Sequence, residues 1–167
     1  SKQRKINIVE WLDSQSKPSE SWHNFISNIE FDSDDLDSVS CNGVITGMFN
    51  CLHNNLMKHN EKDIPLRAFQ QKQSSLFIFT KETWNEITFK EFETAICCMH
   101  KKCMQEFMTW QSKAETTMSP SDFTLAFTEK IGKINEKTTI QISKKIFKKI
   151  YDEYKIDIKS IIDIEVE

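Results

Sequence analysis

The sequence predicts an α+β fold: a single, mostly α-helical domain with one β-hairpin at about residues 64–80. The 167-residue chain has only three Gly and three Pro, whereas an all-β fold needs many tight turns built from such residues. Apolar residues also recur every three or four positions along most of the chain, which is the period of an amphipathic helix. This length suffices for one hydrophobic core, and a small N-terminal helical subdomain over residues 1–36 is the alternative.

Two helices separated by an acidic loop are predicted after the N-terminal segment. Ser19 is the expected N-cap of the first helix. Residues 30–37 carry five acids and no base, and we expect them to form a solvated loop. A second helix should cover residues 39–58, with Asp37 or Ser38 as its N-cap. The apolar residues at helical spacing in the first helix are Trp22, Phe25, Ile26 and Ile29.

The hairpin is predicted from two short apolar runs, PLRAF and SLFIFT. Both runs are rich in aromatic and β-branched residues, which favour strands. The six polar residues between them, QQKQSS, fit a hairpin loop. Because this loop has a single charge and is rich in Gln, we interpret it as a solvated turn and not as a segment that reads bases.

Three further helices are predicted in the C-terminal half. Thr88 and Glu91 form a capping box that starts a helix over residues 89–111, before the polar break SKAETTM. Ser119 followed by Pro120 signals the start of the next helix. The last helix has an apolar stripe formed by Ile142, Ile146, Ile150 and Tyr154, and an opposite basic face formed by Lys144, Lys145, Lys148 and Lys149.

The net charge of −3 provides no overall attraction to nucleic acid or to an anionic membrane. Residues 130–159, however, carry nine Lys against four acids and form a local basic region. The five cysteines are odd in number and lack the spacing of a secreted disulfide framework. No signal-like apolar segment follows SKQRK, and no apolar run reaches the roughly 18 residues that span a bilayer. We therefore expect a reducing intracellular compartment and no membrane contact.

One segment resembles a recurring segment in uncharacterised proteins of giant (nucleocytoplasmic large) DNA viruses. The residues that carry the resemblance are Pro65-Leu-Arg-Ala-Phe, Lys72, Leu76-Phe77-Ile78, Trp84, His100-Lys101-Lys102, Trp110-Gln111 and KKIFKKIYDEY, within residues 40–156. In those proteins a Pro-Ile-His-Cys-x-Asp strand precedes a Lys-Arg pair, an apolar-Tyr-apolar strand and a Trp. Here Ala68, Gln70 and Gln73 replace the Cys, the Asp and the Arg, so no chemistry of those positions is carried over.

The resemblance implies an origin in a large DNA virus and a non-enzymatic accessory or binding role. The first expected function is therefore a non-catalytic viral protein-interaction or assembly module. Its partner would be a viral or host protein, with a homo-oligomer as an alternative, in the host cytoplasm, the nucleus or the virion. No cofactor is expected.

The alternative function is sequence-independent nucleic-acid binding through the Lys-rich C-terminal helix. A helix followed by a hairpin is also the arrangement of a winged helix, but residues 39–58 carry only one basic residue, Lys58. A solvated amphipathic face is the competing interpretation of the lysines. The expected phosphate contacts are Lys130, Lys133, Lys137, Lys144, Lys145, Lys148 and Lys149, with Arg67 and Lys72 from the hairpin.

Cys97, His100 and Cys103 are weak candidates for metal ligands, because they lie at intervals of three residues on one predicted helix. Structural zinc sites usually use short loop knuckles, which this chain lacks. Buried cysteine behaves as a small apolar residue, so we expect core packing and no metal. An enzyme of unknown class is the third alternative. It is ranked last because the sequence has no phosphate-loop, dinucleotide, hydrolase-elbow or zinc-protease motif.

Overall fold

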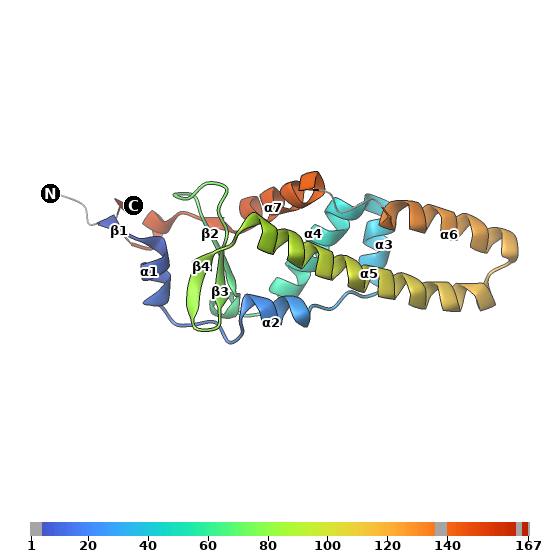
Figure 1. Cartoon of the computed structure of the whole chain (residues 1–167), viewed down its shortest axis with the longest axis horizontal. Coiled ribbons are helices and arrows are strands. Elements are labelled where there is room, and N and C mark those ends of the chain that lie inside the picture. Colours follow the sequence, from blue (N-terminus) through green and yellow to red (C-terminus); the bar gives the residue numbers. More distant parts are fainter. Residues whose placement is uncertain (1–4, 136–139, 163–164, 167) are drawn as a thin grey trace.

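In a computed structural model, the chain forms an elongated molecule with a small sheet at one end and a two-helix hairpin projecting from the other (Figure 1). The structure describes residues 5–135, 140–162 and 165–166. The predicted class, α+β and mostly helical, is confirmed by the seven α-helices and short strands of this described part. β1 (Lys5–Ile6) and β6 (Glu165–Val166) pair in parallel, so the two ends of the chain lie together at the sheet end.

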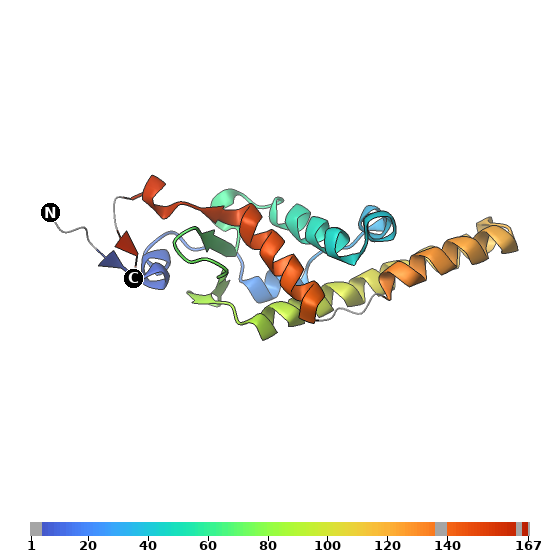
Figure 2. The same ribbon diagram turned by 90° about the horizontal axis from the view of Figure 1, so that it is seen from above.

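The sequence analysis predicts some of the helices but not all of their boundaries. They are α1 (Ile8–Asp13), α2 (Trp22–Ser27), α3 (Ser33–Asn42), α4 (Val44–Leu56), α5 (Phe89–Thr117), α6 (Pro120–Ile134) and α7 (Ile140–Tyr154), with short 3-10 helices η1 (Glu61–Asp63) and η2 (Ile158–Ser160). Seen from above, α7 crosses the molecule between α4 and α5 (Figure 2), and it packs on both.

The predicted hairpin is confirmed and forms the centre of a four-stranded sheet. β2 (Leu66–Phe69) and β3 (Phe77–Thr80) are antiparallel, with Leu66 opposite Ile78. β4 (Thr83–Glu86) continues antiparallel from β3, and β5 (Lys155–Ile156) pairs with β2 in parallel, which gives the order β4–β3–β2–β5. Because β5 directly follows α7, the sheet holds the C-terminal end of α7 beside the hairpin.

The loop predicted over residues 30–37 is wrong, because Asp32 starts a helix. The Asp32 carboxylate accepts a hydrogen bond from the Asp35 backbone N–H at 3.0 Å, and the Asp35 carboxylate accepts one from the Asp32 N–H at 2.9 Å. This reciprocal capping box satisfies two N–H groups at the helix start, and acids there also suit the helix dipole. In α2 the N-cap is Ser21 instead of the predicted Ser19.

The single helix predicted over residues 39–58 is two helices that meet at Gly43. Gly43 has a φ of +90°, a conformation that favours glycine, and it lies between the end of α3 and the start of α4. Neither Asp37 nor Ser38 is therefore an N-cap. The two helices approach each other closely at Gly47, where a β-carbon would lie 2.4 Å from Cγ2 of Val39.

The predicted end of the helix at residue 111 is also wrong, since α5 continues to Thr117. SKAET contains good helix formers and neither Gly nor Pro, and Ala114 within it is buried. Ser119 caps α6 as predicted, accepting from the Asp122 N–H at 3.3 Å. The projecting α5–α6 hairpin is held by the rings of Phe107, Trp110, Phe123 and Phe127, whose neighbouring centroids lie 5.4–6.1 Å apart.

Buried apolar residues form two clusters. The larger one lies between the helices α2 to α7 and the inner face of the sheet. The smaller one lies at the sheet end and consists of Ile8, Leu12, Phe69, Phe77, Phe79, Trp84 and Ile158. The described part of the N-terminal segment, residues 5–36, contributes to both clusters, since Ile8 and Leu12 of α1 belong to the smaller one and Trp22 and Phe25 of α2 to the larger one.

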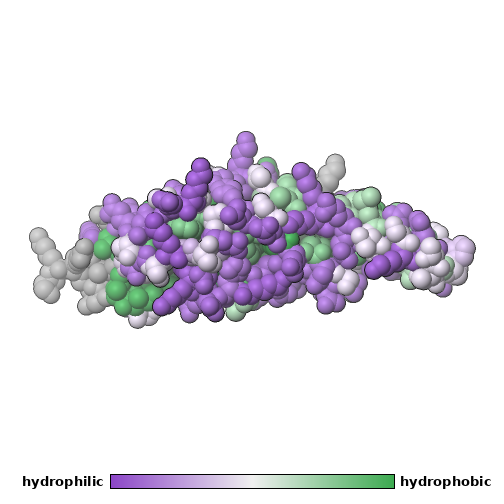
Figure 3. Space-filling view, turned by 90° about the horizontal axis from the view of Figure 1, so that it is seen from below, coloured by the Kyte–Doolittle hydropathy of each residue, from purple (hydrophilic) through white to green (hydrophobic). Residues whose placement is uncertain are grey.

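The face of the molecule seen in Figure 3 is mainly hydrophilic, with hydrophobic residues gathered at the end where α1 lies. Ile156 and Ile161 are exposed at this end, beside Trp11, and the other large exposed apolar side chains are spread along the chain as Met57, Met108, Met118, Leu125 and Ile140. Within the described ranges, no helix combines the length and the apolar character that a bilayer crossing requires.

Candidate functional site

A pocket near the predicted basic residues lies between the QQKQSS loop and one side of α7. Its volume is about 790 Å³, within the range of roughly 300–1,000 Å³ that is usual for ligand sites. We call it the basic pocket. It is lined by Gln70, Gln73, Ser74, Ile87, Phe89, Lys144, Phe147, Lys148, Tyr151, Asp152 and Lys155.

The charge of the basic pocket comes from three lysines against one aspartate. Lys144 and Lys148 lie one helical turn apart on α7, about 6 Å along the axis. Both are exposed, and neither forms an ion pair or side-chain hydrogen bond with another described residue. Lys155 lies 3.5 Å from Asp152 Oδ1 and 5.6 Å from the centre of the Tyr151 ring. Two cationic groups are therefore free to meet an anion at this rim.

The position of α7 beside the loop is fixed by hydrogen bonds between distant segments. The buried Tyr151 hydroxyl donates to the carbonyl oxygen of Phe69 at 3.1 Å. The Gln71 amide donates to Asp157 Oδ1 at 2.6 Å and accepts from the Ile158 N–H at 3.1 Å. Because Gln71 ties the loop to the chain beyond β5, the exposed Gln70 and Gln73 are left at the pocket.

The QQKQSS loop is thus an exposed turn, as predicted, and it is also one wall of the pocket. Ser74, at the turn, has a φ of +57°, a left-handed conformation that non-glycine residues adopt infrequently. Lys72 is only half-exposed and does not line the pocket.

Of the predicted basic residues that the structure describes, only Lys144 and Lys148 line the basic pocket. Lys145 and Lys149 lie on α7 outside the pocket, and Lys149 Nζ is 5.5 Å from the centre of the Phe49 ring. Lys130 of α6 lies 3.7 Å from Asp37 Oδ1 and 5.1 Å from the centre of the Trp110 ring, so its charge is already partnered. Lys133 is exposed on the same helix. Lys137 lies outside the described residues.

The guanidinium group of Arg67 binds to the protein's own backbone. Its guanidinium donates to the carbonyl oxygens of Ile64, Leu66 and Lys62, and it lies 4.9 Å from the centre of the Trp84 ring. Burial lowers the pKa of Arg67 below its ordinary value. We therefore leave Arg67 out of the proposed interface.

The three weak metal candidates have different environments. Cys103 is buried in the core, as expected for an apolar filler, and burial raises the pKa of its thiol to about 12. The expected core packing is wrong for Cys97, which is exposed, and His100 is only half-buried, with its Nε2 2.8 Å from the carbonyl oxygen of Ile134. Among the residues that the structure describes, no three His, Cys, Asp or Glu side chains are placed to hold a metal ion.

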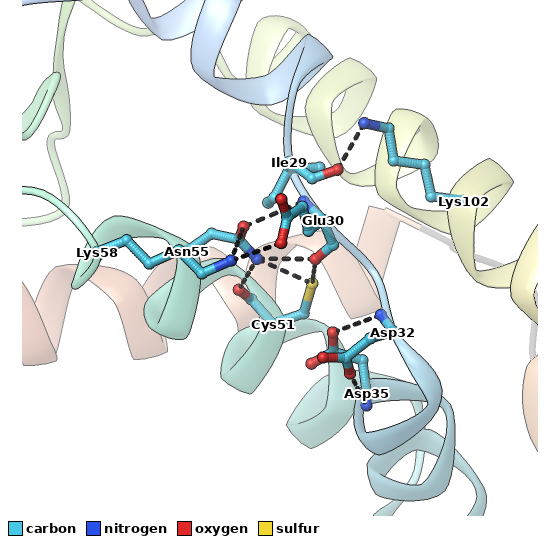
Figure 4. Close-up of polar contacts among 8 residues, drawn as sticks. All are labelled: Ile29, Glu30, Asp32, Asp35, Cys51, Asn55, Lys58 and Lys102. Atoms are coloured by element: carbon cyan, nitrogen blue, oxygen red, sulfur yellow. Dashed lines mark hydrogen bonds and ion pairs between the residues drawn. The ribbon is translucent and has the colours of Figure 1, made fainter.

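A buried polar network anchors the segment between α2 and α3 (Figure 4). Asn55 of α4, only 6% exposed, donates to the carbonyl oxygens of Glu30 at 2.9 Å and Cys51 at 2.8 Å, and it accepts from the Glu30 N–H at 3.1 Å. Lys102 of α5 donates to the carbonyl oxygens of Ser27 and Ile29 at 2.7 and 2.6 Å. Since these groups satisfy one another, the network holds the fold together and leaves no open site.

The acids next to this network have opposite pKa shifts. Burial, together with the nearby charge of Asp32, raises the pKa of Asp35 to about 6. Hydrogen bonds from the backbone N–H groups of residues 34 and 35 lower the pKa of Asp32. Burial also raises the pKa of the Cys51 thiol, which donates to the carbonyl oxygen of Glu30 at 3.4 Å. Both Cys51 and Cys103 are therefore protonated at neutral pH and unsuited to nucleophilic chemistry.

A second, smaller pocket of about 330 Å³ lies at the sheet end. Trp11, Phe69 and Trp84 line it, and Ile156 and Ile161 at its rim are 38% and 54% exposed. Glu61, Lys62 and Arg67 also line this second pocket, so it combines apolar and charged side chains, as the basic pocket does.

Sequence reasoning found Lys144 and Lys148 but missed the pocket that they line. Gln70, Gln73 and Ser74 were seen as part of a solvated loop, and Lys155 was not singled out. The available signal was the repeat of lysines at an interval of four residues beside Phe147 and Tyr151, which places charge and aromatic surface next to each other on one helix.

The fold and the site define a mostly helical α+β protein with a basic, aromatic-floored pocket. Comparisons with protein-family models, with curated proteins and with solved structures gave no match. The resemblance to giant-virus proteins stays a prediction.

Proposed function

We propose that the chain is a non-catalytic binding protein that holds nucleic acid, without sequence preference, at the basic pocket of α7. The observation that carries this proposal is the pair Lys144 and Lys148, exposed and without ionic partners among the described residues, at the rim of a pocket of about 790 Å³. Free lysines lose little when they meet phosphate, because no internal ion pair has to be broken.

The surroundings of these lysines support nucleic acid over an acidic protein segment. Nucleic-acid affinity without sequence preference comes from lysines that neutralise phosphates and from aromatic rings on which bases stack. The basic pocket has both, since Phe89 and Phe147 line it together with the lysines. The sequence analysis ranks a protein partner first; we place nucleic acid first because the lysines and the aromatic rings line the same pocket.

The proposal is tested by the salt dependence of binding. A fluorescent oligothymidylate of about 20 nucleotides is titrated with the full chain between about 50 and 200 mM salt. For single strands the slope of log K against log salt is about −0.7 per neutralised phosphate. Lys144→Ala/Lys148→Ala should therefore make the slope shallower by about 1.4.

Lys101→Ala/Lys113→Ala is the matched control. Both residues are exposed lysines of α5, about 18 Å and 36 Å along that helix from Phe89, so their loss should leave the slope unchanged. Absence of binding at about 50 mM salt, or an equal change in both double variants, would overturn the proposal.

A protein partner is the second candidate, and the exposed apolar side chains at the second pocket favour it. Ile156 and Ile161 are exposed beside Trp11, and exposed apolar groups around a pocket are typical of protein contacts. A pull-down with the full chain, with and without nuclease, separates the candidates, because protein partners survive digestion. Light scattering tests a homo-oligomer. The viral origin and the reducing intracellular compartment stay predictions.

A further inference from the structure

The basic pocket contains groups that a phosphate alone would not need. Its floor is apolar, because Ile87 and the rings of Phe89, Phe147 and Tyr151 line it. Ile87 and Tyr151 are buried, whereas Phe89 and Phe147 are half-buried and retain accessible ring surface. A site for phosphate only would be served by the lysines at the rim, so the floor indicates that the ligand also has a flat apolar part.

The wall opposite α7 supplies hydrogen-bonding groups. Gln70, Gln73 and Ser74 line this wall, and all three are exposed. None of their side chains forms a hydrogen bond with another residue that the structure describes. A glutamine amide both donates and accepts, and a serine hydroxyl does the same. These groups can therefore pair with the polar edge of any nucleobase, without demanding one base.

We propose that the basic pocket takes an unpaired nucleobase, so that the nucleic acid bound there is single-stranded. This inference rests on the nucleic-acid-binding function proposed above and specifies its ligand. Lys144 and Lys148 contact the phosphates on either side of the base, Phe147 and Phe89 provide the apolar surface, and Gln70 and Gln73 meet the base edge. Single-stranded nucleic acid is commonly recognised in this way, by stacking on aromatic side chains within a basic groove.

A duplex cannot use the pocket in the same manner. Its bases are stacked and paired, and removing one from the stack costs a few kcal/mol. The QQKQSS loop forms a wall beside α7, so a duplex reaches only the lysines at the rim. Duplex binding should therefore depend on salt and not on the pocket floor.

An abasic strand provides the direct test, because it has the phosphates of the oligothymidylate and no bases. The full chain is titrated with labelled oligothymidylate and with an abasic strand of equal length at one salt concentration. Stacking of one base changes affinity by about 5- to 150-fold, so oligothymidylate should bind tighter by a factor in this range. Gln70→Ala/Gln73→Ala should reduce this ratio without changing the affinity for the abasic strand.

The outcomes separate this inference from the function on which it rests. Equal affinity for both strands would overturn the base assignment and leave phosphate binding intact, whereas no binding of either strand would overturn both. An acidic peptide that displaces oligothymidylate at equal charge concentration would overturn the base assignment in favour of an acidic protein segment. Phe147→Leu should lower the ratio as well. Phe147 also packs edge-on against Phe92, with the ring centroids 5.1 Å apart, so circular dichroism is used to check that the Phe147→Leu variant folds. If this variant unfolds, the exposed Gln70→Ala/Gln73→Ala variant decides the test.

Discussion

Replacing Gly47 with alanine tests the close approach of α3 and α4. A β-carbon at position 47 would lie 2.4 Å from Cγ2 of Val39, and 2.8 and 2.9 Å from its Cα and backbone nitrogen. Two of these three atoms belong to the backbone of α3, so rotation of the Val39 side chain does not relieve the contact. The helices must move apart, and we expect Gly47→Ala to destabilise the protein.

Two opposing effects determine the size of the change. Alanine is favoured over glycine within a helix by about 1 kcal/mol. Overpacking of a tight contact costs about 1–3 kcal/mol, and we expect the upper part of this range because Val39, Val44 and Met48 around the contact are fully buried. The net loss in the free energy of unfolding should be about 1–2 kcal/mol.

Gly132 provides the matched control, because it also lies in a helix and no atom from another described part of the chain lies within 4 Å of its would-be β-carbon. Gly132→Ala should therefore raise the free energy of unfolding by about 0.4–1 kcal/mol. Urea unfolding followed by circular dichroism measures both variants, with a shifted midpoint at constant slope as the readout. Stabilisation of both variants to the same extent would refute the close approach of the two helices.

Asn55→Ala should lower the free energy of unfolding by about 1–3 kcal/mol, because it removes the amide that satisfies the carbonyl oxygen of Glu30; an unchanged urea midpoint would contradict this role. The pKa of Asp35 is raised to about 6 from 3.8, so its contribution to stability is fully present below pH 3.8 and is lost as the pH rises through about 6. As the pH rises from 3.8 to about 6, the free energy of unfolding of Asp35→Asn should therefore increase relative to that of the wild type. A difference between the two proteins that stays constant over this pH range would refute the raised pKa. Iodoacetamide should label the exposed Cys97 in the folded protein and spare Cys103, which is buried with a raised thiol pKa; equal labelling by mass spectrometry would contradict the buried position.

The starts of several helices could be predicted because the signals are local. Thr88 with Glu91, and Ser119 with Pro120, begin α5 and α6 as expected. Local sequence signals did not predict the secondary structure correctly where the same residue type is common in two kinds of structure. The acids around Asp32 fit a solvated loop as well as a helix N-terminus, and only the packing of the following helix on α4 decides between them.

The basic pocket was harder to predict from the sequence, because segments that are far apart in the chain form it. The hydrogen bond from Tyr151 to Phe69 joins residues 82 positions apart, and it brings α7 to the loop that carries Gln70. A charge count finds Lys144 and Lys148 but cannot show which lysines are already partnered. It therefore predicted Arg67 as a phosphate contact, although three backbone carbonyls surround its guanidinium.

We propose above that α7 and the QQKQSS loop together bind single-stranded nucleic acid. Chemical-shift mapping by NMR of the labelled full chain, titrated with oligothymidylate, tests this claim most directly. We expect the largest shift changes on residues 70–74 and on Lys144, Lys148 and Lys155, with little change in the projecting α5–α6 hairpin. Changes confined to that hairpin or to the sheet end, with residues 70–74 unaffected, would contradict it.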